Sequence, residues 1–156
     1  MTLMIEPIVE LVAAPIALER DLAQAFWTTA QAAYPTGEAW PLASFERDLQ
    51  AAHRRYVVLT VDGQVVGYLG VIQVLDQVDV TGIAVHPTYQ RQGLAIRLFE
   101  TLLANLDAGT MVFLEVRQSN LPAQRLYQRL GFQVIGTRPA YYQHPNEDAI
   151  LMKLTV

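Results

Sequence analysis

The sequence predicts an α/β fold in which helices flank a mixed, mostly antiparallel sheet with a central parallel pair of strands. Three observations lead to this class. β-rich stretches alternate with amphipathic stretches of helical period. Asp62-Gly63 joins two β-rich stretches and is typical of a tight hairpin turn. A strand, a helix and a strand follow one another between residues 78 and 116, an order that favours a parallel, right-handed unit. The expected order is βαα-βββ-α-β-α-β-β.

The first half of the chain is predicted to form one strand, two helices and then three strands. A proline opens the first helix, and apolar residues four positions apart mark the second. The three successive strands should pair as an antiparallel meander. The expected strands are 5–12, 56–61, 65–74 and 78–85, and the expected helices run from Pro15 to a break at 34–37 and from 42 to 52.

Two amphipathic helices alternate with short strands in the second half. Six apolar residues recur on one stripe between residues 93 and 106, as in a helix packed on a sheet. Gly131 stands where a left-handed cap would end the second helix. The expected helices are 93–106 and 121–130, and the expected strands are 111–116, 132–135 and 149–154.

The composition indicates one folded domain spanning residues 1–156. Apolar residues make up 52% and charged residues 17%, which suits a protein with a sizeable core. The absence of cysteine excludes disulfides, thiolate metal sites and a thiol nucleophile. A net charge of -4 with the single lysine Lys153 argues against a nucleic-acid partner. His53, His86 and His144 have no metal-ligand spacing, so no metal is expected.

We expect a cytoplasmic protein with no membrane partner. The start of the chain carries Glu6 and Glu10 and no basic region, so it does not read as a signal peptide. No apolar run approaches the roughly 18 residues that a membrane span needs. The composition is compatible with a monomer or a weak dimer.

Residues 90–95, Gln-Arg-Gln-Gly-Leu-Ala, follow one predicted strand and open a helix. The N–H groups at a helix start point outward, and the helix dipole favours negative charge there. Gly93 and Ala95 are small enough for a bulky anion such as a pyrophosphate to approach, and Arg91 could add a positive charge. The alternative is a tight strand-to-helix connection without a ligand. The segment has neither the Gly-Lys-Ser/Thr of a Walker loop nor the spaced glycines of a dinucleotide site.

Residues 81–95 resemble the acetyl-CoA motif of the GNAT superfamily of N-acetyltransferases. The family pattern Gln/Arg-x-x-Gly-x-Gly/Ala is matched at Gln90, Gly93 and Ala95. Residues 114–120 and 126–132, Leu-Glu-Val-Arg-Gln-Ser-Asn and Leu-Tyr-Gln-Arg-Leu-Gly-Phe, resemble the second half of the same core. Within the superfamily the chain is most similar to the RimI-type ribosomal-protein alanine N-acetyltransferases. It departs from that type at Ala95, where glycine is commoner, and at Ile96, where arginine is common.

The resemblance implies that acetyl-CoA is the co-substrate and that the parallel pair of strands splays apart to hold it. The backbone of Ile83, Ala84 and Val85 would then pair with the pantetheine arm like an added strand. The Val85 N–H would be the donor for the oxyanion. The phosphates would be held by the turn and the first helical residues: Arg91, Gln92, Gly93, Leu94, Ala95 and Ile96.

The resemblance also implies the reacting side chains. Glu115 matches the general base and Tyr127 the general acid, since a phenol keeps its proton at neutral pH. Asn120 would bond the pantetheine or diphosphate region. Each has a structural alternative. Glu115 could pair with Arg117 or another neighbour, Tyr127 could be a core aromatic beside its helix leucines, and Asn120 could cap a helix.

Three functions remain open. The first is acetylation of a protein N-terminus, most of all that of a ribosomal protein, by direct attack in a ternary complex. An α-amine has a pKa of about 8, so a carboxylate base suffices. The second is acetylation of a small-molecule amine or a lysine side chain. The third, from another class, is an acyl-CoA-binding module without catalysis. Candidates for the acceptor groove, each of which could instead be structural, are Trp40, Tyr141, Tyr142, Glu38 and Asp148.

Overall fold

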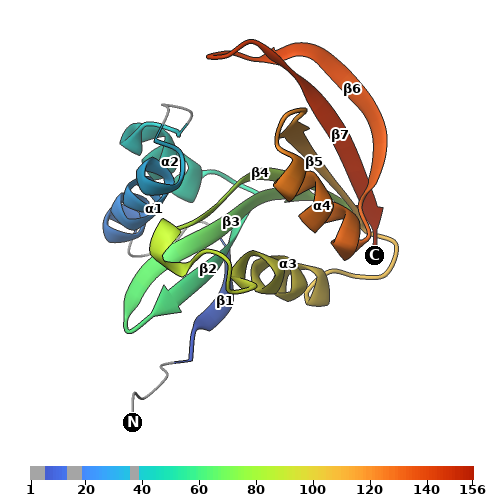
Figure 1. The fold of residues 1–156 in the computed structure, drawn as a ribbon. Coiled ribbons are helices and arrows are strands. Elements are labelled where there is room, and N and C mark those ends of the chain that lie inside the picture. The colour runs from blue at the N-terminus through green and yellow to red at the C-terminus, as the bar shows by residue number, and fades with distance from the viewer. Residues whose placement is uncertain (1–5, 14–18, 36–38) are drawn as a thin grey trace.

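A computed structural model of the chain describes residues 6–13, 19–35 and 39–156. The described residues form one mixed sheet with helices on both faces (Figure 1). The strands are β1 (Ile8–Ala13), β2 (Arg54–Val61), β3 (Gln64–Val74), β4 (Gln77–Val85), β5 (Met111–Arg117), β6 (Gln133–Tyr142) and β7 (Glu147–Thr155). The α-helices are α1 (Glu19–Ala33), α2 (Leu42–Gln50), α3 (Leu94–Ala104) and α4 (Leu121–Leu130), and a 3-10 turn η1 covers Pro87–Tyr89.

The strand order is β1-β2-β3-β4-β5-β7-β6, and the β4–β5 pair is parallel while the other neighbours are antiparallel. The predicted mixed α/β class, the meander and the parallel pair are therefore confirmed. Pairing between β4 and β5 ends at Asp79 and Phe113, and the strands diverge beyond that point. A bulge at Thr81, where Gly82 pairs with Gly70 but Val80 with Val71, bends β4 just after it leaves β5.

Two apolar cores lie on opposite faces of the sheet. One contains Phe26, Phe45 and Tyr56 and lies under α1 and α2, and the other includes Phe99 and lies under α3 and α4 (Figure 1). Along β5 the burial alternates, because every second side chain points into the α3–α4 core and the others point to the opposite face. Glu115 belongs to this second set. No helix within the described segments is long and apolar enough to cross a membrane.

Turn and cap signals in the sequence match the backbone closely. Asp62 and Gly63 both have positive φ, 51° and 73°, as a two-residue hairpin turn with right-handed twist requires. Gly131 has φ 106° and ends α4, whose predicted bounds were 121–130. The predicted start of the first strand at residue 5 and the helix opening at Pro15 lie outside the described residues.

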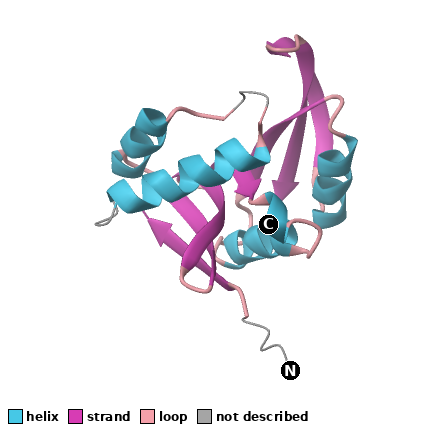
Figure 2. Cartoon of the chain, turned by 60° about the vertical axis from the view of Figure 1, so that its left-hand side comes forward, coloured by secondary structure: helices cyan, strands magenta, loops and turns pink. Residues whose placement is uncertain are grey.

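β6 is longer than the predicted strand at 132–135, because it continues to Tyr142. Nearly all of its residues are exposed, so no apolar alternation marks them, and a proline such as Pro139 is unusual inside a strand. A bulge places residues 139–141 opposite Asp148, whose Oδ1 accepts a hydrogen bond from the Ala140 N–H at 2.8 Å. The β6–β7 hairpin consequently extends beyond the rest of the sheet (Figure 2).

Candidate active site

A cavity of about 620 Å³ opens where β4 and β5 diverge. The α1–α2 segment, the diverging strands, α4 and the β6–β7 hairpin all contribute to its wall. Seven of the predicted site residues line it: Trp40, Ile83, Glu115, Asn120, Tyr127, Tyr141 and Tyr142. The remaining predicted cofactor residues, Ala84, Val85 and residues 91–96, are not among its lining residues.

The backbone of β4 presents alternate residues to the cavity side. The His86 N–H donates to the Val66 carbonyl in β3 at 2.8 Å. Because hydrogen-bonded pairs alternate along antiparallel strands, Ala84 also directs its N–H and C=O to β3, where its partner is Tyr68. Ile83 and Val85 therefore direct their N–H and C=O groups toward the region where β4 and β5 diverge, which we call the splay. The predicted backbone set of three residues is reduced to two, since the backbone of Ala84 faces the other way.

Both outward carbonyls of β4 already accept a hydrogen bond from a side chain. Tyr34 Oη donates to the Ile83 carbonyl at 2.5 Å, and Gln90 Nε2 donates to the Val85 carbonyl at 2.8 Å. Both carbonyl oxygens thus have one partner already, and each keeps a second lone pair. Sequence reasoning missed Tyr34, because Tyr34-Pro35 was interpreted only as a break after the first helix.

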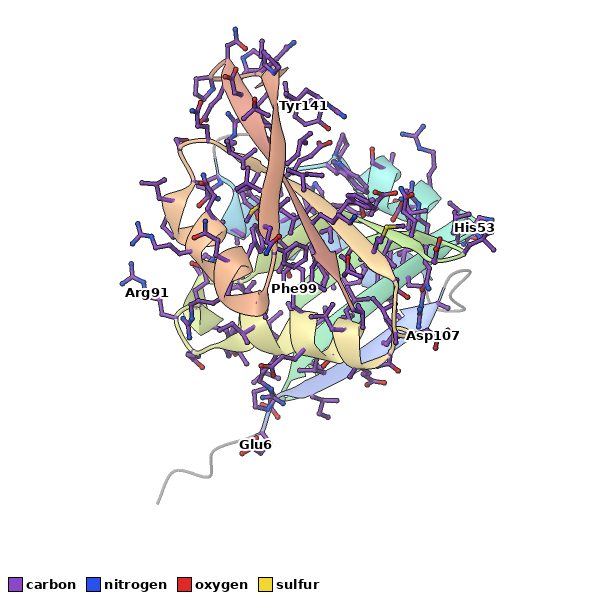
Figure 3. All side chains as sticks on the ribbon, turned by 90° about the vertical axis from the view of Figure 1, so that its right-hand side faces the viewer. Glu6, His53, Arg91, Phe99, Asp107 and Tyr141 are labelled. Atoms are coloured by element: carbon purple, nitrogen blue, oxygen red, sulfur yellow. The ribbon has the colours of Figure 1, made fainter. Side chains whose placement is uncertain are left out.

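The turn before α3 is shaped to leave N–H groups exposed. Arg91 and Gly93 have positive φ of 63° and 73°. The first helical bond runs from the Arg97 N–H to the Gly93 carbonyl at 3.2 Å, so the N–H groups of residues 94–96 have no acceptor within the helix. Such a helix start suits an anion such as a diphosphate. The side chains of Arg91 and Gln92 are exposed, with Arg91 directed away from the body of the protein (Figure 3), and Leu94 is buried.

No atom lies within 4 Å of the position that a Cβ on Gly93 would occupy. The glycine is therefore required by its left-handed φ and not by a close neighbour. The expectation that a small residue at 93 leaves room for an anion stays a prediction.

Glu115 is paired with Arg138 rather than with Arg117. Its Oε1 lies 3.2 Å from Nη1 of Arg138, and the carboxylate also bonds the Tyr141 hydroxyl, which raises the pKa of Tyr141. The Arg138 guanidinium lies 5.0 Å from the centre of the Tyr141 ring. The structural alternative for Glu115, an ion pair with a neighbour, is therefore observed, and the same carboxylate also lines the cavity.

Arg117 ties the β6–β7 hairpin to the segment before α4. Its guanidinium lies 4.5 Å from the centre of the Tyr142 ring. Glu147, which pairs with Arg117, also accepts a hydrogen bond from the Ser119 N–H at 2.5 Å. Hydrogen bonding to Ser119, from its side chain first and then from its N–H, lowers the pKa of Glu147, and Arg117 lowers it further. The polar contacts of Arg117 are Glu147 Oε1 at 3.2 Å and the carbonyl oxygens of Gln143 at 3.0 Å and Pro145 at 3.1 Å.

Tyr127 is both a core aromatic residue and a residue of the cavity wall. Its ring packs edge-on against Phe99 at 5.5 Å and lies 5.9 Å from that of Phe132, measured between centroids, and only 7% of the residue is exposed. It also lines the cavity. Burial, with smaller contributions from Tyr34 and Tyr142, raises the pKa of Tyr127 well above its ordinary value. The hydroxyl therefore holds its proton firmly.

Asn120 is the N-cap of α4 and also lines the cavity. Its Oδ1 accepts a hydrogen bond from the Ala123 N–H at 3.2 Å. That bond uses the side-chain oxygen, so the amide nitrogen is the group that a ligand could address. The cap and the proposed ligand contact are compatible.

The acceptor candidates separate into two groups. Trp40, whose ring lies 5.4 Å from that of Phe45, borders the cavity together with Tyr141 and Tyr142. Asp148 does not border it and instead supports the β6 bulge. Glu38 lies outside the described residues. In the described part of the chain, no three His, Asp or Glu side chains gather as a metal site would require.

Comparisons with known proteins show what the chain as a whole is similar to. The family model described as acetyltransferase (GNAT) family matches residues 20–132. The chain is 38% identical over 120 residues to the N-alpha-acetyltransferase RimI of Mycobacterium tuberculosis, covering 74% of this chain and 75% of that protein. It is 40% identical over 102 residues to the ribosomal protein bS18-alanine N-acetyltransferase of Escherichia coli K12, covering 63% and 69%. The crystal structure of the Escherichia coli ribosomal-protein-S18-alanine N-acetyltransferase superposes with a TM-score of 0.82 at 33% identity, covering 96% of this chain and 94% of that one.

Proposed function

Because the chain belongs to the acetyltransferase (GNAT) family, we propose that it transfers the acetyl group of acetyl-CoA to the N-terminal α-amine of a protein, in particular a ribosomal protein. The observation that carries this proposal is the common cavity of Glu115 and Tyr127 at the splay of the parallel strands. A carboxylate and a protonated phenol that line one cavity can serve as the base and the acid of one reaction.

The start of α3, the edge of β4 and the cavity together suit acetyl-CoA as a substrate. The unsatisfied N–H groups at the start of α3 suit its diphosphate. The unpaired edge of β4, with the outward N–H groups of Ile83 and Val85, suits the amides of the pantetheine arm. Asn120 also lines the cavity. The phosphate end and the reactive end of the substrate would thus be held by different elements.

The proposed reaction is direct attack in a ternary complex. Glu115 accepts a proton from the acceptor amine, directly or through a water, and the amine nitrogen bonds to the thioester carbon. The Val85 N–H stabilises the tetrahedral oxyanion. The carbon–sulfur bond then breaks, and Tyr127 donates its proton to the departing sulfur. The products are an acetylated amine and the thiol of CoA. Glu115 then releases the amine proton to solvent, and Tyr127 takes up a proton from solvent, so both groups return to their starting state.

An α-amine is the acceptor that the Glu115 carboxylate can deprotonate most readily. Its pKa is about 8, so a useful fraction is neutral at pH 7, whereas a lysine amine has a pKa of about 10.4. Trp40, Tyr141 and Tyr142 border the open part of the cavity beside Glu115 and could flank an extended peptide. The names of the two sequence relatives and of the matched crystal structure describe acetylation of an α-amine or of an N-terminal alanine.

Purified protein should be incubated with acetyl-CoA and matched acceptors to test the proposal. One peptide carries a free N-terminal alanine and no lysine, a second has a blocked N-terminus and one internal lysine, and a third acceptor is a polyamine. We expect acetylation of the first alone and strong loss with Glu115→Gln while acetyl-CoA still raises the Tm. Preference for the lysine or the polyamine would replace the α-amine as acceptor. A rise in Tm without any acetylation would indicate the non-catalytic module.

A further inference from the structure

Beyond Asp79, no strand among the described residues pairs with the edge of β4 that faces β5. Pairing with β5 ends at Asp79, yet Ile83 and Val85 direct their N–H and C=O groups to that side. Along the edge these groups alternate, so the Val85 N–H lies between the two carbonyl oxygens. Backbone groups in a partly buried strand need hydrogen-bond partners, and here the partners must come from elsewhere.

Tyr34 supplies one of them from the far end of α1. Its own N–H bonds the Ala30 carbonyl at 2.8 Å, which fixes its backbone to the last turn of the helix. Its hydroxyl donates to the Ile83 carbonyl at 2.5 Å, a contact between residues 49 positions apart. Gln90 satisfies the Val85 carbonyl at 2.8 Å. The carbonyls of Ile83 and Val85 therefore accept hydrogen bonds from side chains, where a neighbouring strand would otherwise donate backbone N–H groups.

The hydrogen bonds to the Ile83 and Val85 carbonyls favour the approach of a thioester carbonyl oxygen to the edge of β4. Uncapped carbonyl oxygens beside the Val85 N–H would repel the oxygen of a thioester. With both carbonyls bonded to donors, the groups that remain to contact an incoming carbonyl oxygen are N–H donors. Tyr34 also lines the same cavity as Tyr127, and its proximity contributes to the raised pKa of Tyr127. Tyr34 is thus adjacent to both the proposed oxyanion donor and the proposed acid.

We propose that Tyr34 is a positioning residue for acetyl transfer, whose hydroxyl holds the Ile83 carbonyl in place of β5 and so aims the β4 N–H donors at the thioester carbonyl. The inference rests on the proposed function, because it assumes that a thioester lies along β4. It assigns a role in the reaction to the end of α1, an element on the opposite face of the sheet from the phosphate-binding turn.

Tyr34→Phe removes only the hydroxyl and is the variant to test. With wild-type protein, acetyl-CoA and an N-terminal alanine peptide, we expect kcat to fall about three- to tenfold, the effect of one lost hydrogen bond, while the peptide KM changes less than about twofold. Hydrogen–deuterium exchange of residues 80–86 should become faster. Thr155→Val is the control, because it removes an exposed hydroxyl at the end of β7, outside the cavity and the acetyl-CoA motif, and should leave kcat unchanged.

The outcomes separate this proposal from the function on which it rests. An active wild type with unchanged kcat in Tyr34→Phe overturns the positioning role, even if exchange at residues 80–86 becomes faster. A wild type without acetyl transfer removes the proposed function and this role together. Should Tyr34→Phe fail to fold, Gln90→Leu carries the same test at the other carbonyl. A lower kcat at constant peptide KM in Gln90→Leu then supports the proposal that side-chain hydrogen bonds to the β4 carbonyls position the N–H donors. An unchanged kcat contradicts it.

Discussion

The carboxylate of Glu115 and the guanidinium of Arg138 form an ion pair of 3.2 Å at the mouth of the splay. Arg138 is the more exposed partner, with 53% of its side chain accessible against 28% for Glu115. An ammonium acceptor that approaches Glu115 must therefore compete with a cation already placed there. Arg138 lines a second, smaller cavity that also contacts Glu115, so it has space to move when the acceptor enters.

Replacing Arg138 with Gln should lower the KM of a peptide acceptor by about two- to fivefold at low salt, because the competing charge is removed. The difference should shrink as salt screens the remaining charges. Steady-state kinetics at two ionic strengths measure both effects. Arg129→Gln removes an exposed charge at the end of α4 and serves as the control. A raised KM in Arg138→Gln would show that Arg138 attracts or orients the acceptor instead.

Gly93→Ala should weaken acetyl-CoA binding and reduce stability together. Its φ of 73° is costly for a side-chain residue, roughly 1–2 kcal/mol, and relief of that strain would turn the N–H groups at the start of α3. Gly109 has φ 91° and no atom within 4 Å of an added Cβ, as at Gly93, but lies away from the splay. Gly109→Ala should therefore lose similar stability with unchanged acetyl-CoA affinity. Calorimetry and thermal unfolding test the pair, and equal affinity loss in both variants would contradict the role of the turn.

Tyr127→Phe should reduce kcat by about a hundredfold or more, because the proposed acid is lost. The ring contacts with Phe99 and Phe132 remain, so the Tm should change little. Since burial raises the pKa of Tyr127 above about 10, the proton stays bound at lower pH. The ratio of wild-type to variant kcat should thus be constant between about pH 6 and pH 9. A ratio that falls with pH in this range would mean that Tyr127 loses its proton there.

Most of the fold follows from local signals in the sequence. Periodicity and caps define α4 at residues 121–130, and Asp62-Gly63 defines a hairpin, because these features depend on neighbours in the chain. The length of β6 does not follow, since an exposed strand with a proline and a bulge carries no apolar alternation. The motif residues were found by resemblance, whereas their contacts were not. Tyr34 with Ile83 and Glu115 with Arg138 are pairs distant in sequence that only the folded sheet brings together.

The hairpin contact made by Glu147 should depend on pH. Hydrogen bonds from Ser119, from its side chain first and then from its N–H, lower the pKa of Glu147 below its unfolded value. A depressed pKa means that the contact contributes fully above the unfolded pKa and is lost as the pH falls through the folded one. The protection of residues 143–147 against hydrogen–deuterium exchange, measured relative to the intrinsic rate at each pH, should therefore fall in acid, and Glu147→Gln should abolish that dependence. Glu46→Gln, on the exposed side of α2, is the control. The same acid response in Glu147→Gln would assign it to another group.

The central claim is that this protein acetylates a ribosomal protein N-terminus through Glu115. It is tested most directly by mass spectrometry of the N-termini of ribosomal proteins from a deletion strain complemented with wild-type protein or with Glu115→Gln. We predict that an N-terminal alanine, that of bS18 first, loses its acetyl group in the deletion strain, regains it with the wild type and does not regain it with the variant. Full acetylation of every ribosomal N-terminus in the deletion strain would contradict the claim.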